Sequence, residues 1–470
     1  MNADTHNSSL AFQGITELSQ QLAHGAVTSR GLTELYLQRI AVHNPKLNCF
    51  ITVMTDQALA AADASDARRK NRSLRGPLDG IPIAIKDNID VAGVPTTAGI
   101  EARRRETPTT DATVIAKLKS AGTVILGKLN MHEGAHGATT ANEAYGFCYN
   151  PHRDGFTPGG SSGGSGAALA AGLCAAALGT DTLGSIRIPS SFCGIAGLKP
   201  TQGLVSTSGV VPLAWSLDHV GPMARTVNDL ALMLEAMAGP DGADPFSRTA
   251  SSHALAAFEI PKSLRGVRIG RLRDLASFAS DAVHPDITKA YEAALKQLTK
   301  LGAQVIDVEL KGYHHNLIRP KAMLVIEADL ATYYAKALEQ NPLGFSQIFR
   351  DGVAFGQQQN APKLALAFET IRAVRPIANS LFADVDVLVT PTTPCPAFAF
   401  LQTMPKNLTA FTSLANYVGA PAASVPMGQT SDQLPMGLQV TARPWADATA
   451  LSIAAAYEAA ANHPIRPVLT

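Results

Sequence analysis

Residues 157–166 read Thr-Pro-Gly-Gly-Ser-Ser-Gly-Gly-Ser-Gly, and residues 179–189 read Gly-Thr-Asp-Thr-Leu-Gly-Ser-Ile-Arg-Ile-Pro. Twelve small or apolar residues, 167–178, separate these two stretches, and most of them are alanine. Glycine at this density permits positive φ angles and a close approach of backbone amides to a ligand. A serine beside such amides becomes a nucleophile when a base is near. The alanine-rich segment predicts a tightly packed helix and strand, which would bring both stretches to one pocket.

The composition indicates a soluble, cytoplasmic, globular protein. With 470 residues, 46% of them hydrophobic and 16% charged, the chain can bury a large core. The net charge is +1, without a long run of one sign, which argues against direct nucleic-acid or membrane partners. The five cysteines show no CxxC spacing and are typical of reduced thiols. Neither a signal peptide nor an apolar segment of bilayer-spanning length is recognisable.

Helical and strand patterns alternate along the chain, which predicts an α/β fold. A helix is predicted behind Thr28 and is expected to end at Asn44-Pro45, whereas 194–201 is interpreted as a turn-rich return. Further strands are predicted at 49–53, 81–86, 123–126, 304–308, 385–390, 423–427 and 437–441. Further helices are predicted at 112–119, 227–237, 287–301, 363–374, 414–419 and 448–461.

We expect one large domain rather than two independent ones, because the alternation of apolar strands, turns and helices seen in the first half resumes after residue 380. Four segments are predicted: an N-terminal helical layer (1–75), a core (76–240), a more charged helical excursion (241–380) and a C-terminal part of the core (381–470). The clearest internal break is Gly-Pro-Asp-Gly at 239–242.

Lys86 ends an alternating apolar strand, Gly-Ile-Pro-Ile-Ala-Ile-Lys-Asp at 80–87. An arbitrary lysine in such a place is more often a solvated residue at a strand end. The alternative is a desolvated amine whose pKa is low enough for it to act as a base.

His132, Glu133 and His136 match the zinc-hydrolase pattern His-Glu-x-x-His in letters. That pattern needs a helix to place both histidines on one face, and a third ligand downstream. Gly134 and Gly137 weaken a helix, so a structural or pocket-lining role is favoured over metal binding. No metal and no cofactor are predicted, and a zinc hydrolase remains a remote alternative.

Three ordered motifs together resemble the amidase signature family. They are the strand ending at Lys86, Gly-Gly-Ser-Ser-Gly-Gly-Ser around Ser161, and Gly-Thr-Asp-Thr-Leu-Gly-Ser-Ile-Arg-Ile-Pro around Ser185. The similarity continues through 192–201, 386–393 and 421–426, and it is densest over 76–224. The resemblance implies a mixed β-sheet core covered by helices.

The resemblance also implies a Ser–cis-Ser–Lys triad. Ser185 would be the nucleophile, Ser161 the bridging serine and Lys86 the general base, with Ser161 preferred over its neighbour Ser162 on spacing. The backbone N–H groups of Thr182, Leu183, Gly184 and Ser185 would form the oxyanion hole. Many relatives carry glycine where this chain has Leu183. Residues predicted to line the substrate pocket are Met131, His132, Glu133 and Ser162.

Two side chains near the second stretch are assigned structural roles: Asp181 is expected to brace its loop, and Arg187 to form an internal ion pair. The function implied is hydrolysis of a small-molecule carboxylic amide, at a carbon–nitrogen bond other than a peptide bond, with ester cleavage left open. The alternative is the glutamine-hydrolysing subunit of a tRNA-dependent amidotransferase, which works with partner subunits. A non-enzymatic relative is disfavoured because all three triad residues are present. A homodimer stays open.

Overall fold

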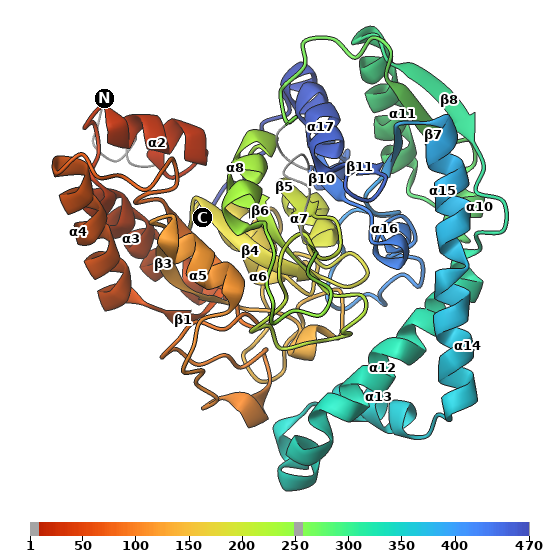
Figure 1. Cartoon of the computed structure of the whole chain (residues 1–470), viewed down its shortest axis with the longest axis horizontal. Coiled ribbons are helices and arrows are strands. Elements are labelled where there is room, and N and C mark those ends of the chain that lie inside the picture. The colour runs from red at the N-terminus through yellow and green to blue at the C-terminus, as the bar shows by residue number, and fades with distance from the viewer. Residues whose placement is uncertain (1–8, 249–256, 470) are drawn as a thin grey trace.

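A sheet of eleven strands runs through the computed structural model, which describes residues 9–248 and 257–469 (Figure 1). The strand order is β1-β3-β2-β4-β6-β5-β10-β11-β9-β7-β8. The strands are β1 (Phe50–Val53), β2 (Pro82–Lys86), β3 (Val124–Leu129), β4 (Ala176–Asp181), β5 (Ala196–Lys199), β6 (His219–Ala224), β7 (Arg268–Leu272), β8 (Gln304–Val308), β9 (Val387–Pro391), β10 (Ala422–Gln429) and β11 (Pro435–Ala442).

The sheet is mixed. β2 lies between β3 and β4 and is parallel to both, whereas β4–β6, β6–β5, β5–β10, β10–β11 and β11–β9 are antiparallel pairs. Parallel pairing resumes from β9 to β7 and from β7 to β8. β2, β3 and β4 are buried along their whole length, as is typical of strands inside parallel sheets, and polar residues occur only toward their C-terminal ends. The predicted α/β class with a mixed sheet is confirmed.

Two short helices, α6 (Gly163–Ala170) and α7 (Arg187–Cys193), pack against the central strands, and every residue of both is buried. Small side chains allow α6 to come very close to its neighbours. A Cβ atom on Gly164 would clash with the carbonyl oxygens of Asn130 and Cys49. The Gly/Ser-rich composition therefore serves close packing as well as the site.

Other helices cover the sheet and extend beyond it. Figure 1 shows α2 to α4 at the N-terminal end of the molecule and α12 to α14 projecting from the opposite end. These helices are α2 (Ile15–Ala23), α3 (Ser29–Leu47), α4 (Thr55–Lys70), α5 (Thr113–Ser120), α8 (Val227–Met237), α10 (Leu275–Ala279), α11 (Pro285–Lys300), α12 (His315–Gln340), α13 (Gln347–Gln357), α14 (Ala361–Arg372), α15 (Val374–Asp384), α16 (Ser413–Val418) and α17 (Asp447–Ala461), with 3₁₀ turns at Glu101–Arg103, Glu133–Ala135 and Pro342–Gly344.

The structure corrects two local predictions. The helix behind Thr28 does not end at Asn44-Pro45: α3 continues to Leu47, because a proline this close to a helix end costs few hydrogen bonds, and Asn48 closes it in the left-handed conformation (φ 51°). The return at 194–201 contains strand β5, which pairs with β6 and β10. The four segment boundaries stay a prediction; β1, from the N-terminal segment, and β7 and β8, from the excursion, belong to the same sheet as the core.

No helix in residues 9–248 and 257–469 combines the length and the hydropathy needed to cross a membrane. All five cysteines are free thiols.

Candidate active site

Lys86 lies at the end of β2, and its side chain is fully buried. Its Nζ donates hydrogen bonds to Ser161 Oγ and Thr180 Oγ1, both at 2.7 Å. Thr180 belongs to β4, so the amine is held between the first Gly/Ser-rich stretch and the neighbouring parallel strand. Sequence reasoning missed Thr180, although its place beside β2 in the sheet could have suggested it.

Burial lowers the pKa of Lys86 to about 7, against a smaller opposing effect of the carboxyl groups of Asp218 and Asp181. Burial also raises the pKa of Asp218 to about 6, although Thr182 Oγ1 (2.5 Å) and two backbone amides donate to its carboxyl group. Lys86 and Asp218 do not form an ion pair with each other in the described structure. Near neutral pH a large fraction of Lys86 is therefore the free amine, which can accept a proton.

Ser161 and Ser162 have different environments. A cis peptide bond joins Gly160 to Ser161, and the Ser161 hydroxyl contacts Lys86. The Ser162 hydroxyl instead donates to the Thr180 carbonyl oxygen (3.1 Å) and accepts from the Thr180 amide (3.3 Å). Ser162 thus ties α6 to β4, and Ser161 is the serine that faces the amine.

The turn that carries Ser185 is braced by the Asp181 carboxylate. Asp181 accepts hydrogen bonds from the amides of Gly184 (2.8 Å) and Ile186 (3.1 Å). Two nitrogens of Arg187 donate to the same carboxylate at 3.0 and 2.9 Å, and both side chains are fully buried. Burial alone would raise the pKa of Asp181, but Arg187 holds it well below its ordinary value. The expected internal ion pair and the bracing role of Asp181 are both present.

The predicted set of oxyanion donors needs one correction. The Gly184 N–H already donates to Asp181, so it is not free for a substrate. In the part of the chain that the structure describes, the amides of Thr182, Leu183 and Ser185 have no partner. Three of the four predicted donors are therefore available.

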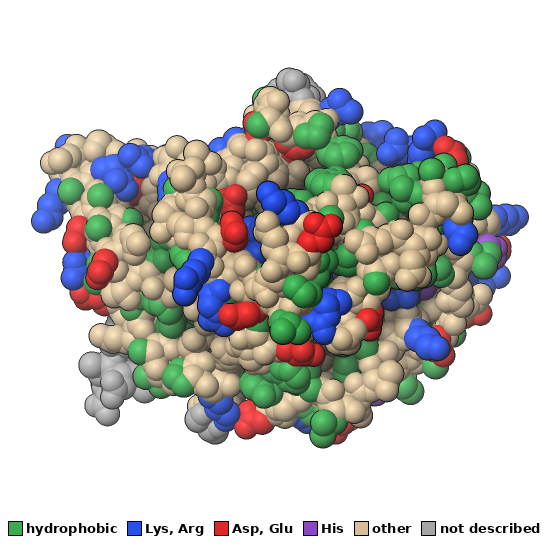
Figure 2. All heavy atoms as spheres, turned by 90° about the horizontal axis from the view of Figure 1, so that it is seen from below, with side chains coloured by type: hydrophobic (Ala, Val, Ile, Leu, Met, Phe, Trp, Pro, Cys, Tyr) green, Lys and Arg blue, Asp and Glu red, His purple; other side chains and the backbone are tan. Residues whose placement is uncertain are grey.

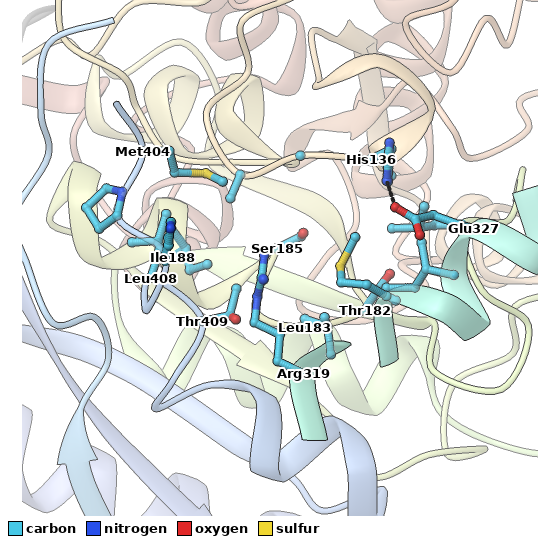
Figure 3. Close-up of a pocket in the computed structure, with 18 residues that line it drawn as sticks. His136, Thr182, Leu183, Ser185, Ile188, Arg319, Glu327, Met404, Leu408 and Thr409 are labelled. Carbon is cyan, nitrogen blue, oxygen red and sulfur yellow. Dashed lines mark ion pairs between the residues drawn. The ribbon is translucent and has the colours of Figure 1, made fainter. Parts of the chain in front are cut away.

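A cavity of about 250 Å³ opens beside this turn (Figure 3). Its volume is near the lower end of the usual range for small-molecule sites, about 300–1,000 Å³. Most of its lining comes from four parts of the chain: residues 135–138, the turn with Ser185, helix α12 and the 404–409 loop. The lining residues are Ala135, His136, Gly137, Ala138, Thr182, Leu183, Ser185, Ile188, Leu213, Arg319, Met323, Ile326, Glu327, Met404, Pro405, Lys406, Leu408 and Thr409.

The four residues predicted to line the pocket do not line this cavity. Met131 is fully buried, and Ser162 is bonded to β4. The His132 ring packs over Gly137 and lies 3.4 Å from Thr139 Oγ1, and Glu133 accepts from the Ser346 amide (3.0 Å). Of the four, His132 packs against a residue of the lining, Gly137. Much of the cavity wall is instead formed by α12 and the 404–409 loop, which are remote in sequence, and a role of these four residues in substrate binding stays a prediction.

His136 and Glu327 meet on the cavity wall, where His136 Nε2 lies 3.9 Å from Glu327 Oε1 (Figure 3). Burial lowers the pKa of His136 to about 4 and raises that of Glu327 to about 7. The imidazole is therefore neutral at physiological pH. The sequence analysis assigned neither His136 nor Glu327 to the substrate pocket, although His136 is the second histidine of the His-Glu-x-x-His pattern.

The zinc alternative gains no support from the geometry. Residues Glu133–Ala135 form a single 3₁₀ turn in which Gly134 has a φ of 55°, so the two histidines are not on one face of a helix. Within the described residues no group of three or more His, Cys, Asp or Glu side chains could hold a metal ion.

Comparison with known proteins gives matches over nearly the whole chain. A family model described as Amidase matches residues 31–451. A glutamyl-tRNA(Gln) amidotransferase subunit of Koribacter versatilis is 37% identical over 462 residues, covering 92% of this chain and 95% of the relative. The structure of the native peptide amidase of Stenotrophomonas maltophilia superposes with a TM-score of 0.87, at 32% identity, covering 97% of this chain and 98% of that one. A protein from a vestigial complex, solved to trace the origins of an s-triazine catabolic enzyme, gives a TM-score of 0.89 at 33% identity, covering 97% and 100%.

Proposed function

Because the chain belongs to the amidase family, we propose that it hydrolyses a carboxylic amide through an acyl-enzyme on Ser185. The observation that carries this proposal is the 2.7 Å contact between the buried Lys86 amine and Ser161, whose neighbour Ser162 donates its amide to the Ser185 carbonyl oxygen at 3.2 Å. Within the described chain the Ser185 hydroxyl has no hydrogen-bond partner, so it is free to turn toward a substrate carbonyl.

In the first half of the reaction, neutral Lys86 takes the proton of the Ser161 hydroxyl as Ser161 takes that of Ser185. The Ser185 oxygen attacks the amide carbon, and the free amides of Thr182, Leu183 and Ser185 stabilise the oxyanion. The same relay then returns a proton to the amide nitrogen, the carbon–nitrogen bond breaks, and the amine leaves.

In the second half, water attacks the acyl ester on Ser185 and gives its proton to the relay. The carbon–oxygen bond to Ser185 breaks, Ser185 recovers a proton, and the carboxylic acid departs. No metal or cofactor is needed to balance either half.

The test is to trap the acyl-enzyme. A fluorophosphonate probe, or rapid quenching with a slow amide, should add mass to the peptide that contains Ser185, and Ser185→Ala should abolish the label. Mass found on Ser161 or Ser162 instead would reverse the proposed roles.

A second candidate is the glutamine-hydrolysing subunit of a tRNA-dependent amidotransferase. It is favoured by the curated relatives, which include glutamyl-tRNA(Gln) amidotransferase subunits 37% and 38% identical over more than nine-tenths of this chain. The chemistry at Ser185 would be the same in both cases, and the two differ in the amide and in the need for partner subunits.

Expression of the chain alone separates the two candidates. A free-standing amidase should release ammonia from simple amides without any partner and should show no preference for glutamine. An amidotransferase subunit should be inactive alone, or select glutamine, and should gain activity from its partner subunits.

A further inference from the structure

Arg319, from the first turns of α12, lines the cavity that Ser185 borders, and Figure 3 shows its side chain extending from the helix into that space. The side chain is partly buried. Among the described residues it takes part in no ion pair, and its buried Nε has no hydrogen-bond partner. A cation in this position is unlike Arg187, which is fully neutralised by Asp181.

The other ionisable groups of the cavity do not fully compensate Arg319. His136 is neutral at physiological pH because burial lowers its pKa. Lys406, at the exposed edge of the cavity, adds a second positive charge. Glu327 is the one carboxyl group of the lining and contacts His136; burial raises its pKa to about 7, against a smaller opposing effect of Arg319. The cavity therefore has an excess of positive charge near neutral pH.

Partial burial of the Arg319 charge without a counter-charge costs solvation free energy, which a bound anion would offset. The Arg319 guanidinium brings a positive charge and several N–H donors to this partly buried position. Its planar fork of N–H groups fits a carboxylate with two parallel hydrogen bonds. A second donor is near the same space: Thr409 also lines the cavity, and its hydroxyl oxygen is buried without a partner among the described residues.

We propose that Arg319 binds a carboxylate carried by the substrate, so that the preferred substrates are monoamides of dicarboxylic acids rather than neutral amides. The inference rests on the proposed amide hydrolysis and specifies its substrate class. The amide carbonyl lies at Ser185, the carboxylate at Arg319 and Thr409, and the methylene chain between them against apolar residues of the lining such as Leu183 and Ile188.

The experiment compares matched pairs of amides. Succinamate, glutaramate and adipamate are each tested against the neutral amide in which an isopropyl group replaces the carboxylate. Since a charge-assisted bidentate contact is worth roughly 10- to 100-fold, kcat/KM for the best anionic amide should exceed that of its neutral partner by about this ratio. Arg319→Leu should bring this ratio close to one, mainly by raising KM for the anionic amide. Arg319→Lys should keep part of the preference for the anionic amide.

Lys336→Leu is the matched control, because Lys336 is an exposed cation on the same helix outside the cavity, and this variant should keep the wild-type ratio. A ratio near one in the wild type, or a full ratio in Arg319→Leu, would overturn the inference. If the wild type hydrolyses no amide at all, the proposed function fails instead. In that case the affinity for glutarate is measured by calorimetry in Ser185→Ala and in the double variant that also carries Arg319→Leu. Binding at least tenfold weaker in the double variant supports the inference, and equal binding refutes it.

Discussion

Lys86 and Lys199 are both fully buried, and burial lowers the pKa of each to about 7. Their contacts differ. Lys86 Nζ reaches the hydroxyls of Ser161 and Thr180, whereas Lys199 Nζ donates to the Pro200 carbonyl oxygen at 2.8 Å. A low pKa alone therefore does not distinguish the proposed base from Lys199, and the hydrogen bond to a serine hydroxyl does.

The rate should increase as Lys86 loses its proton. Because the free amine is the active form and its pKa is lowered to about 7, kcat/KM should rise with pH, reach half its maximum near pH 7 and level off above it. Lys86→Ala should lose this limb together with roughly 10²–10⁴-fold of the rate. Lys86→Arg should not restore it, since a guanidinium stays protonated. The measurement is a pH–rate profile on one amide.

Lys199→Met serves as the control for that profile. It removes a buried amine of similarly lowered pKa that makes no hydrogen bond to Ser161 or Ser185 among the described residues, so the rise of the rate near pH 7 should persist. A limb that disappears in Lys199→Met and remains in Lys86→Ala would exclude Lys86 as the base.

The buried pair of Asp181 and Arg187 should be important for stability. Asp181→Asn leaves the Arg187 guanidinium buried without its counter-charge, which typically costs about 3–5 kcal/mol in the free energy of unfolding. Asp307→Asn is the control, since Asp307 pairs with Arg271 and Arg273 at the surface and should matter little. Urea denaturation of both variants tests this, and equal losses would contradict it.

At the scale of elements, α6 depends on its glycines. Gly164→Ala places a methyl group against two backbone carbonyl oxygens, which cannot move aside as a side chain could. Overpacking of this kind costs about 1–3 kcal/mol. Because α6 begins next to Ser161 and Ser162, a shift of the helix should also lower kcat.

Gly242→Ala is the matched control for this prediction. Gly242 is exposed and has nothing within 4 Å of the position that a Cβ atom would occupy, so its substitution should be close to neutral. Thermal melts of the two variants, together with their kcat on one amide, make the comparison. A stable and fully active Gly164→Ala protein would show that α6 has more room than the structure indicates.

Continuous, mainly apolar segments could be predicted from the sequence with nearly the observed bounds. The 304–308 strand has its predicted bounds, and the 448–461 helix differs from α17 by one residue. α12 was not foreseen, because Pro320 lies inside it and it mixes polar and apolar residues without a clear stripe. α7 was hidden by its serines and proline, which are typical of loops.

The sequence predicted only those candidate site residues that lie in motifs of neighbouring residues. Lys86, Ser161 and Ser185 lie in motifs that can be recognised along the chain. Thr180 and Asp218 contribute through sheet pairing, since β4 lies between β2 and β6. The opposite wall of the cavity comes from α12 and the 404–409 loop, more than a hundred residues downstream of Ser185. No periodicity reveals which remote segments will meet there.

At the scale of the whole molecule, the sheet continues without interruption from the N-terminal segment into the excursion (Figure 1). β7 pairs with β9 in register from Ile269–Val387 to Arg271–Val389, and Tyr291 of α11 donates to the Val389 carbonyl oxygen at 3.0 Å. The view in Figure 2 shows positive and negative side chains interspersed over one face. Such mixing agrees with a net charge of +1.

Because the excursion shares the sheet with the core, the chain should unfold as one cooperative unit despite its 470 residues. Its two tryptophans report on different regions: the Trp215 amide donates to Asp329 of α12 at 3.0 Å, and the Trp445 amide to Thr201 Oγ1 at 2.9 Å. Trp215→Phe and Trp445→Phe each leave one probe. Their urea transitions should coincide with each other and with that of the far-UV circular dichroism. An earlier transition confined to Trp215 fluorescence would mean that the excursion unfolds on its own, in which case the pairing of β7 with β9 contributes little to holding the two parts together.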